Sequence, residues 1–210
     1  MLVRDYMTLN PITVKPEDSV GDALKLLKDH SIRRLPVVTR DGMVGIVTEQ
    51  DLLKASPSAA TSLSVWEINY LFPKIKIKDI MTKDIITVSP DAVLEEAALI
   101  MRENNISSLP VMIDGKLMGI ITESDIFKAL IDVFGFNVPS VRLTLSVQDE
   151  VGTIKKISET VSSLGLNIIS LIVQSLDGGR GNIILRLSTD DITGVVAAFR
   201  NKNIEVSHIN

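Results

Sequence analysis

The chain lacks cysteine and has little histidine or aromatic content, and each shortage excludes a class of function. Its 210 residues include no Cys, 2 His and 4% aromatic residues. Without cysteine there is no disulfide, no thiolate nucleophile and no Cys-ligated zinc or iron–sulfur site. His30 and His208 lie far apart in the sequence, outside any ligand-spaced cluster. No serine, lysine or carboxylate has a neighbouring base and an orienting group, so we expect no catalysis, no metal and no cofactor.

The charge balance and the hydrophobic runs exclude two classes of partner. With 22 Lys and Arg against 26 Asp and Glu, the net charge is -4, which lacks the basic footprint of nucleic-acid binding. No apolar run approaches about 18 residues, and the first residues lack the pattern of a targeting segment. We therefore expect a soluble cytoplasmic protein of one large or two modest domains, with no nucleic-acid and no membrane partner.

An internal repeat organises the first two-thirds of the chain. Met7 and Thr8 recur as Met81 and Thr82, 74 residues later, and the same offset carries further matches without a gap. These further matches are Ile12–Val14 with Ile86–Val88, Leu35–Val37 with Leu109–Val111, and most of Gly45–Asp51 with Gly119–Asp125. Two copies of one unit are therefore present.

Each copy has the same order of predicted elements. A short β-branched strand stops at a proline, and a helix, two strands around an Asp-Gly turn and a final helix follow. The supporting residues are the strands Ile12–Val14 and Ile86–Val88, the stripes Val20, Ala23, Leu24, Leu27 and Leu94, Ala97, Ala98, Met101, the cap Ser19 with Asp22, the turns Asp41–Gly42 and Asp114–Gly115, and the helix starts Thr48 and Thr122. Because one copy cannot bury both faces of its sheet, we expect the copies to pack with approximate twofold symmetry and a ligand cleft between them.

A linker joins the copies, and a second domain follows them. The linker, Ser56 to Leu71, is predicted to end in a short helix. Its Trp66 and Tyr70 could stack on a planar ligand, although packing is the simpler interpretation. The predicted elements of the tail are strand Val141–Val147, a helix over Ile154–Leu164 ended by Gly165, strand Asn167–Ser175, strand Asn182–Ser188, a helix over Ile192–Phe199 and strand Ile204–Ile209. This βαββαβ order is ferredoxin-like, so the chain is α/β (α+β) overall.

The sharpest chemical signal is a Thr-x-x-Asp pair in each copy, Thr48 with Asp51 and Thr122 with Asp125. In one interpretation the threonine caps the helix and the carboxylate completes a capping box. In the other, the carboxylate accepts hydrogen bonds from vicinal ribose hydroxyls in the cleft, while the threonine and the helix N–H groups hold phosphate. The recurrence after the same Gly-Ile strand favours ligand binding.

Two arginines in the first copy have no counterpart in the second. Arg33 and Arg34 precede the strand that borders the cleft, and their forked donors suit phosphate. Alone they would be a solvated surface pair. The second copy has Ser107 and Ser108 there, which predicts two unequal sites, the Arg34 site being tighter for phosphate-bearing ligands.

The repeat resembles a pair of cystathionine-β-synthase (CBS) motifs, the Bateman module, and the tail resembles an ACT domain. The combination, with the segments Ser56–Ser62 and Glu67–Leu71 between the copies, resembles the AcuB-type acetoin-utilisation proteins. The resemblance implies a first CBS motif at 1–58, a helical linker at 59–76, a second CBS motif at 77–136 and an ACT domain at 137–210.

The resemblance also implies the ligand and the residues that hold it. CBS pairs of this kind bind adenosine-containing ligands such as AMP, ADP, ATP or S-adenosylmethionine and regulate a partner. Carried over by position, the first site is Thr48, Asp51, Arg34, Thr82, Ile85, Thr87 and Ser107, and the second is Thr122, Asp125, Thr8, Pro11, Thr13 and Arg33. ACT domains often bind amino acids at a dimer interface, which here implies Asp149, Gly152 and Asn167, or they dimerise edge to edge.

The leading hypothesis is a non-enzymatic homodimer that senses adenine nucleotides and regulates a protein partner. One alternative is an assembly module that has lost ligand binding, and a second is an amino-acid sensor acting through the ACT domain. An enzyme acting on acetoin is the weakest option, because the chain offers no cofactor motif and no activated nucleophile.

Overall fold

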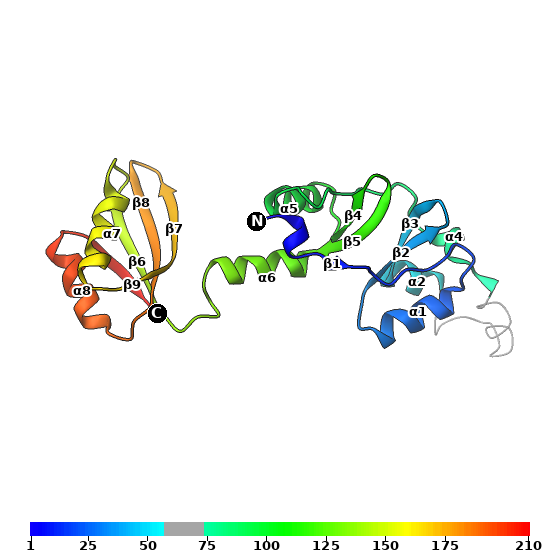
Figure 1. The fold of residues 1–210 in the computed structure, drawn as a ribbon, viewed down its shortest axis with the longest axis horizontal. Helices are drawn as coiled ribbons and strands as arrows, with labels where there is room; N and C mark the ends of the chain where they lie inside the picture. Colours follow the sequence, from blue (N-terminus) through cyan, green and yellow to red (C-terminus); the bar gives the residue numbers. More distant parts are fainter. Residues whose placement is uncertain (57–73) are drawn as a thin grey trace. The chain divides into compact units, whose positions relative to one another are not determined.

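The computed structural model describes residues 1–56 and 74–210. Its contacts divide the chain into two compact units, Met1–Ile126 and Phe127–Asn210, which we describe separately (Figure 1). The expected linker helix, with Trp66 and Tyr70, lies outside the described residues.

The first unit contains both repeats, and their elements correspond closely. In the first repeat these are η1 (Val3–Asp5), β1 (Thr8–Leu9), α1 (Val20–Asp29), β2 (Arg34–Thr39), β3 (Gly42–Thr48) and α2 (Glu49–Ala55). In the second repeat they are α4 (Ile77–Ile80), α5 (Leu94–Glu103), β4 (Ser108–Ile113), β5 (Lys116–Thr122) and α6 (Glu123–Val133). The bounds of α1, β2 and β3 recur in α5, β4 and β5 at the offset of the sequence repeat, which confirms the duplication.

The predicted helix α1 forms for the expected reasons. Val20, Ala23 and Leu27 are buried on one face. At the N-terminus, the Ser19 hydroxyl accepts a hydrogen bond from the Asp22 N–H at 3.1 Å and donates to the Asp22 carboxylate at 2.7 Å. The cap that the sequence predicts is therefore present and satisfies a free helix N–H.

We expect Ser19→Ala to lower the free energy of unfolding by about 1 kcal/mol, because it leaves the Asp22 N–H without its acceptor. Chemical denaturation of the full chain measures this loss. Ser158→Ala, at an exposed Ser hydroxyl inside a helix, is the control. Equal stability of the native protein and Ser19→Ala would refute this role for the cap.

The sheets of the first unit differ from prediction in one respect. The antiparallel pairs are β2 with β3 and β4 with β5, and β1 adds to the outer side of β5. The predicted strands Ile12–Val14 and Ile86–Val88 are wrong as regular strands, since only Val14 and Val88 form single parallel bridges. A proline two residues after each bridge has no N–H to donate, so the ladder cannot continue.

The two hairpin turns differ from each other, although both contain the predicted Asp-Gly. In the second repeat Asp114 and Gly115 occupy the turn, with φ of 48° and 77°, as a tight hairpin requires. In the first repeat the dipeptide lies one position later, and Gly42, with φ of 128°, already pairs with Thr39.

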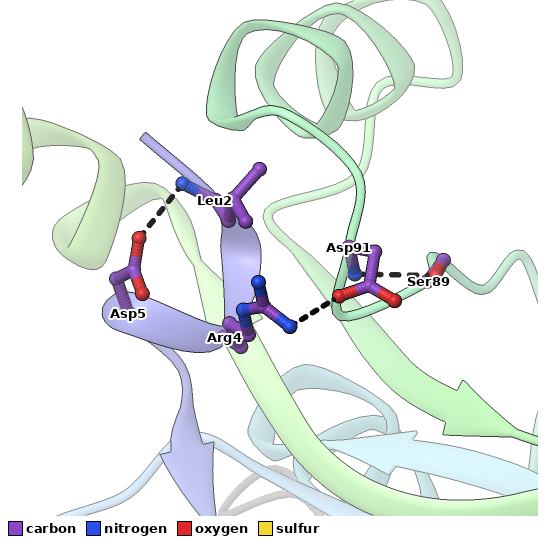
Figure 2. Close-up of polar contacts among 5 residues, drawn as sticks. All are labelled: Leu2, Arg4, Asp5, Ser89 and Asp91. Carbon is purple, nitrogen blue, oxygen red and sulfur yellow. Dashed lines mark hydrogen bonds and ion pairs between the residues drawn. The ribbon is translucent and has the colours of Figure 1, made fainter.

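The leading segment of each repeat packs on the other repeat. Figure 2 shows the first of these contacts, where Arg4 Nη1 lies 2.7 Å from the Asp91 carboxylate. The backbone N–H of Val3 donates to the Ala92 carbonyl at 2.9 Å. The equivalent contacts in the other direction are Lys78 with Glu17 at 3.0 Å and the Ile77 N–H with the Asp18 carbonyl at 3.0 Å. This reciprocal exchange joins the repeats into one module.

The second unit has the predicted βαββαβ order. Its elements are β6 (Val141–Gln148), α7 (Thr153–Ser163), β7 (Ile168–Leu176), β8 (Arg180–Leu187), α8 (Ile192–Asn201) and β9 (Glu205–Ile209). The antiparallel sheet has the strand order β7-β8-β6-β9. Alternate residues of β6 and β8, such as Leu143 and Leu185, pack with Ile157 of α7 and Phe199 of α8. The helices therefore cover one face, and the other alternate residues occupy an open face (Figure 1).

Within residues 1–56 and 74–210, none of the helices combines the length and apolar character needed to span a bilayer.

Candidate functional site

Both Thr-x-x-Asp pairs form capping boxes. Asp51 Oδ2 accepts hydrogen bonds from the Thr48 N–H at 2.9 Å and the Thr48 hydroxyl at 2.6 Å, while its own N–H donates to Thr48 Oγ1 at 3.3 Å. The corresponding distances for Thr122 and Asp125 are 2.9, 2.7 and 3.4 Å. The capping interpretation of the motif is therefore correct in both copies.

The capping boxes leave a hydrogen-bond acceptor on each carboxylate. All the contacts use Oδ2, and within the described residues Oδ1 of Asp51 and of Asp125 accepts no hydrogen bond. Both side chains are half-buried rather than enclosed. One carboxylate oxygen can accept two hydrogen bonds through its lone pairs, so the cap orients the carboxylate and leaves capacity for vicinal hydroxyls. Capping and ligand binding are compatible.

The exchanged segments place one threonine of the other repeat close to each pair. Thr82 exchanges two backbone hydrogen bonds with Ile46 of β3, at 2.9 and 3.0 Å, two residues before Thr48. Thr8 is the register partner of Ile120, two residues before Thr122. The grouping of Thr82 with the first pair and Thr8 with the second therefore follows from strand pairing.

The remaining predicted residues of the exchanged segments lie where the chain crosses between repeats. Thr8 of β1 pairs with β5 of the second repeat, and Val14 bridges to β2 of the first repeat. Pro11 and Thr13 lie on the crossing between these two points. Ile85 and Thr87 lie on the equivalent crossing in the second copy, before Val88. Within the described residues, none of these four makes a side-chain hydrogen bond to a Thr–Asp pair.

Arg34 connects the two repeats. Its guanidinium donates from Nη1 to the carbonyl and from Nη2 to the hydroxyl of Ser107, the latter at 3.1 Å. Burial lowers the pKa of Arg34, and the negative charges of Glu123 and Asp125 partly oppose this effect. Arg34 and Ser107, which the resemblance assigns to the first site, are therefore in contact. The charge of Arg34 also acts on Asp125 of the second Thr–Asp pair. Arg33 is exposed.

Glu49 and Glu123 follow the two threonines and are not among the predicted site residues. Their backbone N–H groups donate to the carbonyls of Arg33 and Ser107, at 2.8 and 3.2 Å, and so connect each helix start to the residue just before β2 or β4. Because every residue except proline has a backbone N–H, the side-chain pattern carries no signal for this contact.

The three residues expected to bind an amino acid lie in two different places on the expected ACT domain. Asp149 and Gly152 line a hollow of about 420 Å³ between the end of β6 and the start of α7. Asn167 lies at the opposite end of the sheet, where its carbonyl accepts hydrogen bonds from the N–H and hydroxyl of Ser188 at 3.2 and 3.4 Å. A single chain therefore does not bring the three together. No cluster of three or more metal-ligating side chains occurs in the described part of the chain.

These features define a class of protein: a duplicated module with exchanged leading segments and two symmetry-related helix caps, joined to a ferredoxin-like domain. The chain belongs to the CBS-domain family, whose model matches residues 3–58 and 77–132. Residues 140–210 match the TTHA0829-like ACT domain. The prediction of a CBS pair followed by an ACT domain is confirmed.

Solved structures and a curated relative resemble the CBS pair. AcuB from Vibrio cholerae is 31% identical over 65% of this chain and 95% of that one, with a TM-score of 0.54. The CBS pair of protein MJ0100, solved with 5′-methylthioadenosine and S-adenosyl-L-methionine, is 33% identical over 62% and 95%, with a TM-score of 0.52. Inosine-5'-monophosphate dehydrogenase from Korarchaeum cryptofilum is 40% identical over 123 residues, which are 58% of this chain but only 23% of the enzyme.

Proposed function

We propose that this protein is a non-catalytic regulator that binds an adenosine-containing ligand between its CBS repeats. The proposal rests on Oδ1 of Asp51 and of Asp125, which accepts no hydrogen bond from residues 1–56 and 74–210. Each of these carboxylates is on a helix start beside a threonine of the other repeat. A carboxylate held by its own helix cap is preorganised, so it accepts ribose hydroxyls without losing side-chain entropy on binding. The adenosine class is supported by the ligands of the MJ0100 CBS pair.

The proposed first site contains Thr48, Asp51, Thr82, Ile85, Thr87 and Ser107 with Arg34, and the proposed second site contains Thr122, Asp125, Thr8, Pro11 and Thr13 with Arg33. Arg34 has five side-chain N–H donors, and among the described residues two of them engage Ser107, which leaves three for a ligand phosphate. Its positive charge near Asp125 also makes the second site less repulsive to an anion. The two sites are therefore unequal.

Regulation follows if the ligand binds one arrangement of the repeats more tightly than another. The Arg34–Ser107 contact crosses between repeats and is a candidate for change on binding. Helix α6 begins at the second Thr–Asp pair and its last residues belong to the unit that contains the ACT domain, which provides a covalent route. The proposal includes a cytoplasmic homodimer that acts on a protein partner, with a link to acetoin utilisation supported by the likeness to AcuB.

A thermal-shift screen tests the function. At a concentration of 100 times Kd, a ligand stabilises its site by about 2.7 kcal/mol, which raises Tm by roughly 5–10 °C for a chain of this size. We expect such a rise with at least one of AMP, ADP, ATP and S-adenosylmethionine, and none with the free amino acids. No rise with any nucleotide would favour the assembly module. A rise only with an amino acid, lost in Asn167→Ala, would favour the ACT domain as the sensor.

A further inference from the structure

The open face of the ACT sheet carries two adjacent arginines. Arg142 of β6 and Arg186 of β8 are direct register partners, and Ser170 of β7 pairs with Arg186 on the other side. All three side chains lie on the face that the helices do not cover. Like charges directly opposite each other destabilise a sheet, so this pair needs a compensating interaction.

The side chain of Arg186 contacts an aromatic ring and a hydroxyl group. Its side chain is 9% exposed, its carbon Cζ lies 4.2 Å from the centre of the Phe136 ring, and Nη1 donates to the Ser140 hydroxyl at 3.1 Å. Within the described residues, the side chain of Arg142 donates only to the Thr144 hydroxyl, at 3.3 Å. Within residues 1–56 and 74–210, neither arginine forms a salt bridge. A buried guanidinium remains charged, and burying it without a counter-charge is costly.

A hollow adjoins the two arginines. Its volume is about 400 Å³, within the range of small-molecule sites. Ser170 and Gln174 add polar groups, and the apolar lining comes from Phe134, Ile172, Val173 and Ile184. The Ser170 hydroxyl donates to the Phe134 carbonyl at 3.1 Å, which fixes the segment after α6 against the sheet.

We propose that this face binds a small organic anion, with its carboxylate or phosphate group between Arg142 and Arg186 and its apolar part against Phe134 and Ile184. The Nε and Nη2 groups of Arg186 donate to no acceptor in the described chain, so they are available to the anion. Paired guanidinium forks give bidentate geometry for either anion. All residues that line this hollow belong to the second unit, and it shares only Val173 with the hollow beside Asp149 and Gly152.

NMR of the full chain tests the site, with the Nε–Hε signals of Arg142 and Arg186 as local reporters. The probes are sodium phosphate and sodium succinate, added at constant ionic strength against sodium chloride. We expect saturable shifts of both signals with at least one probe, and about tenfold weaker binding in Arg142→Gln. Arg200→Gln, which removes the same charge from exposed α8, should bind as the native protein does.

The two probes distinguish the chemical class of the anion. Saturation by phosphate alone indicates a phosphate site, and saturation by succinate alone indicates a carboxylate site. Saturation by both indicates a site that accepts either group. If Arg142→Gln fails to fold, Arg142→Lys keeps the charge and should still bind several-fold more weakly, because an ammonium lacks the fork. No saturation by either probe up to about 10 mM, or native affinity in the Arg142 variant, overturns the proposal.

Discussion

Asp51→Asn is expected to weaken nucleotide binding roughly 10- to 100-fold while it leaves the fold nearly intact, because charge-assisted hydrogen bonds contribute about 1.5–3 kcal/mol. The remaining amide oxygen can still accept from the Thr48 N–H and hydroxyl, so the helix cap survives. The amide nitrogen that replaces the other oxygen is a donor and cannot accept from ribose hydroxyls. Calorimetric titration with AMP measures the change.

Asp22→Asn is the matched control for this variant. Asp22 occupies the same position in the cap of α1, where it accepts from Ser19, but it has no place in the proposed site. We expect its nucleotide affinity to equal that of the native protein. Equal affinities of Asp51→Asn and Asp22→Asn would show that Asp51 serves the helix alone.

Gly119→Ala should destabilise the CBS pair by about 1–3 kcal/mol, because there is no space for a methyl group. A Cβ at Gly119 would lie 2.7 Å from the backbone carbonyl of Thr8 and 2.9 Å from Met7 Sδ. The carbonyl cannot move without displacing β1 from β5. We therefore expect the substitution to disturb both the pairing of the exchanged segment and the second proposed site. Thermal unfolding should show Tm lower by roughly 2–4 °C per kcal/mol.

Gly45→Ala provides the internal comparison for this prediction. Gly45 is the equivalent glycine of the first repeat, and there the closest atom to a new Cβ is the flexible Met81 Sδ, at 2.6 Å, with the Thr82 carbonyl at 3.0 Å. We expect a smaller loss, because the methionine can move more readily than a backbone carbonyl. A native Tm in Gly119→Ala would contradict the close approach of the exchanged segment.

The sequence was sufficient for most of the fold, and in the CBS repeats the duplication supplied each local signal twice. The apolar stripe from Val20 to Leu27 and its copy in α5 located the helices, and Gly165 ended α7 with φ of 69°, as expected. The short strands at Val14 and Val88 were overestimated, since β-branched residues favour a strand but the nearby prolines limit its hydrogen bonds.

The site was only partly predictable. The Thr-x-x-Asp pattern indicated both a cap and a ligand group. The cap uses Oδ2 of each carboxylate, and the ligand contact that we propose would use Oδ1. The exchange of leading segments has no local signal, because pairing of Thr82 with Ile46 depends on tertiary packing. The Arg34–Ser107 contact likewise joins residues far apart in the sequence, and neither local segment predicts it.

The most direct measurement of the central claim is a calorimetric comparison of AMP with 2′,3′-dideoxy-AMP on the native protein. If a carboxylate accepts both ribose hydroxyls, AMP binds with saturable heat and the dideoxy compound binds at least about tenfold more weakly. Equal affinities for the two compounds, or no binding of AMP at millimolar concentration, would contradict the account.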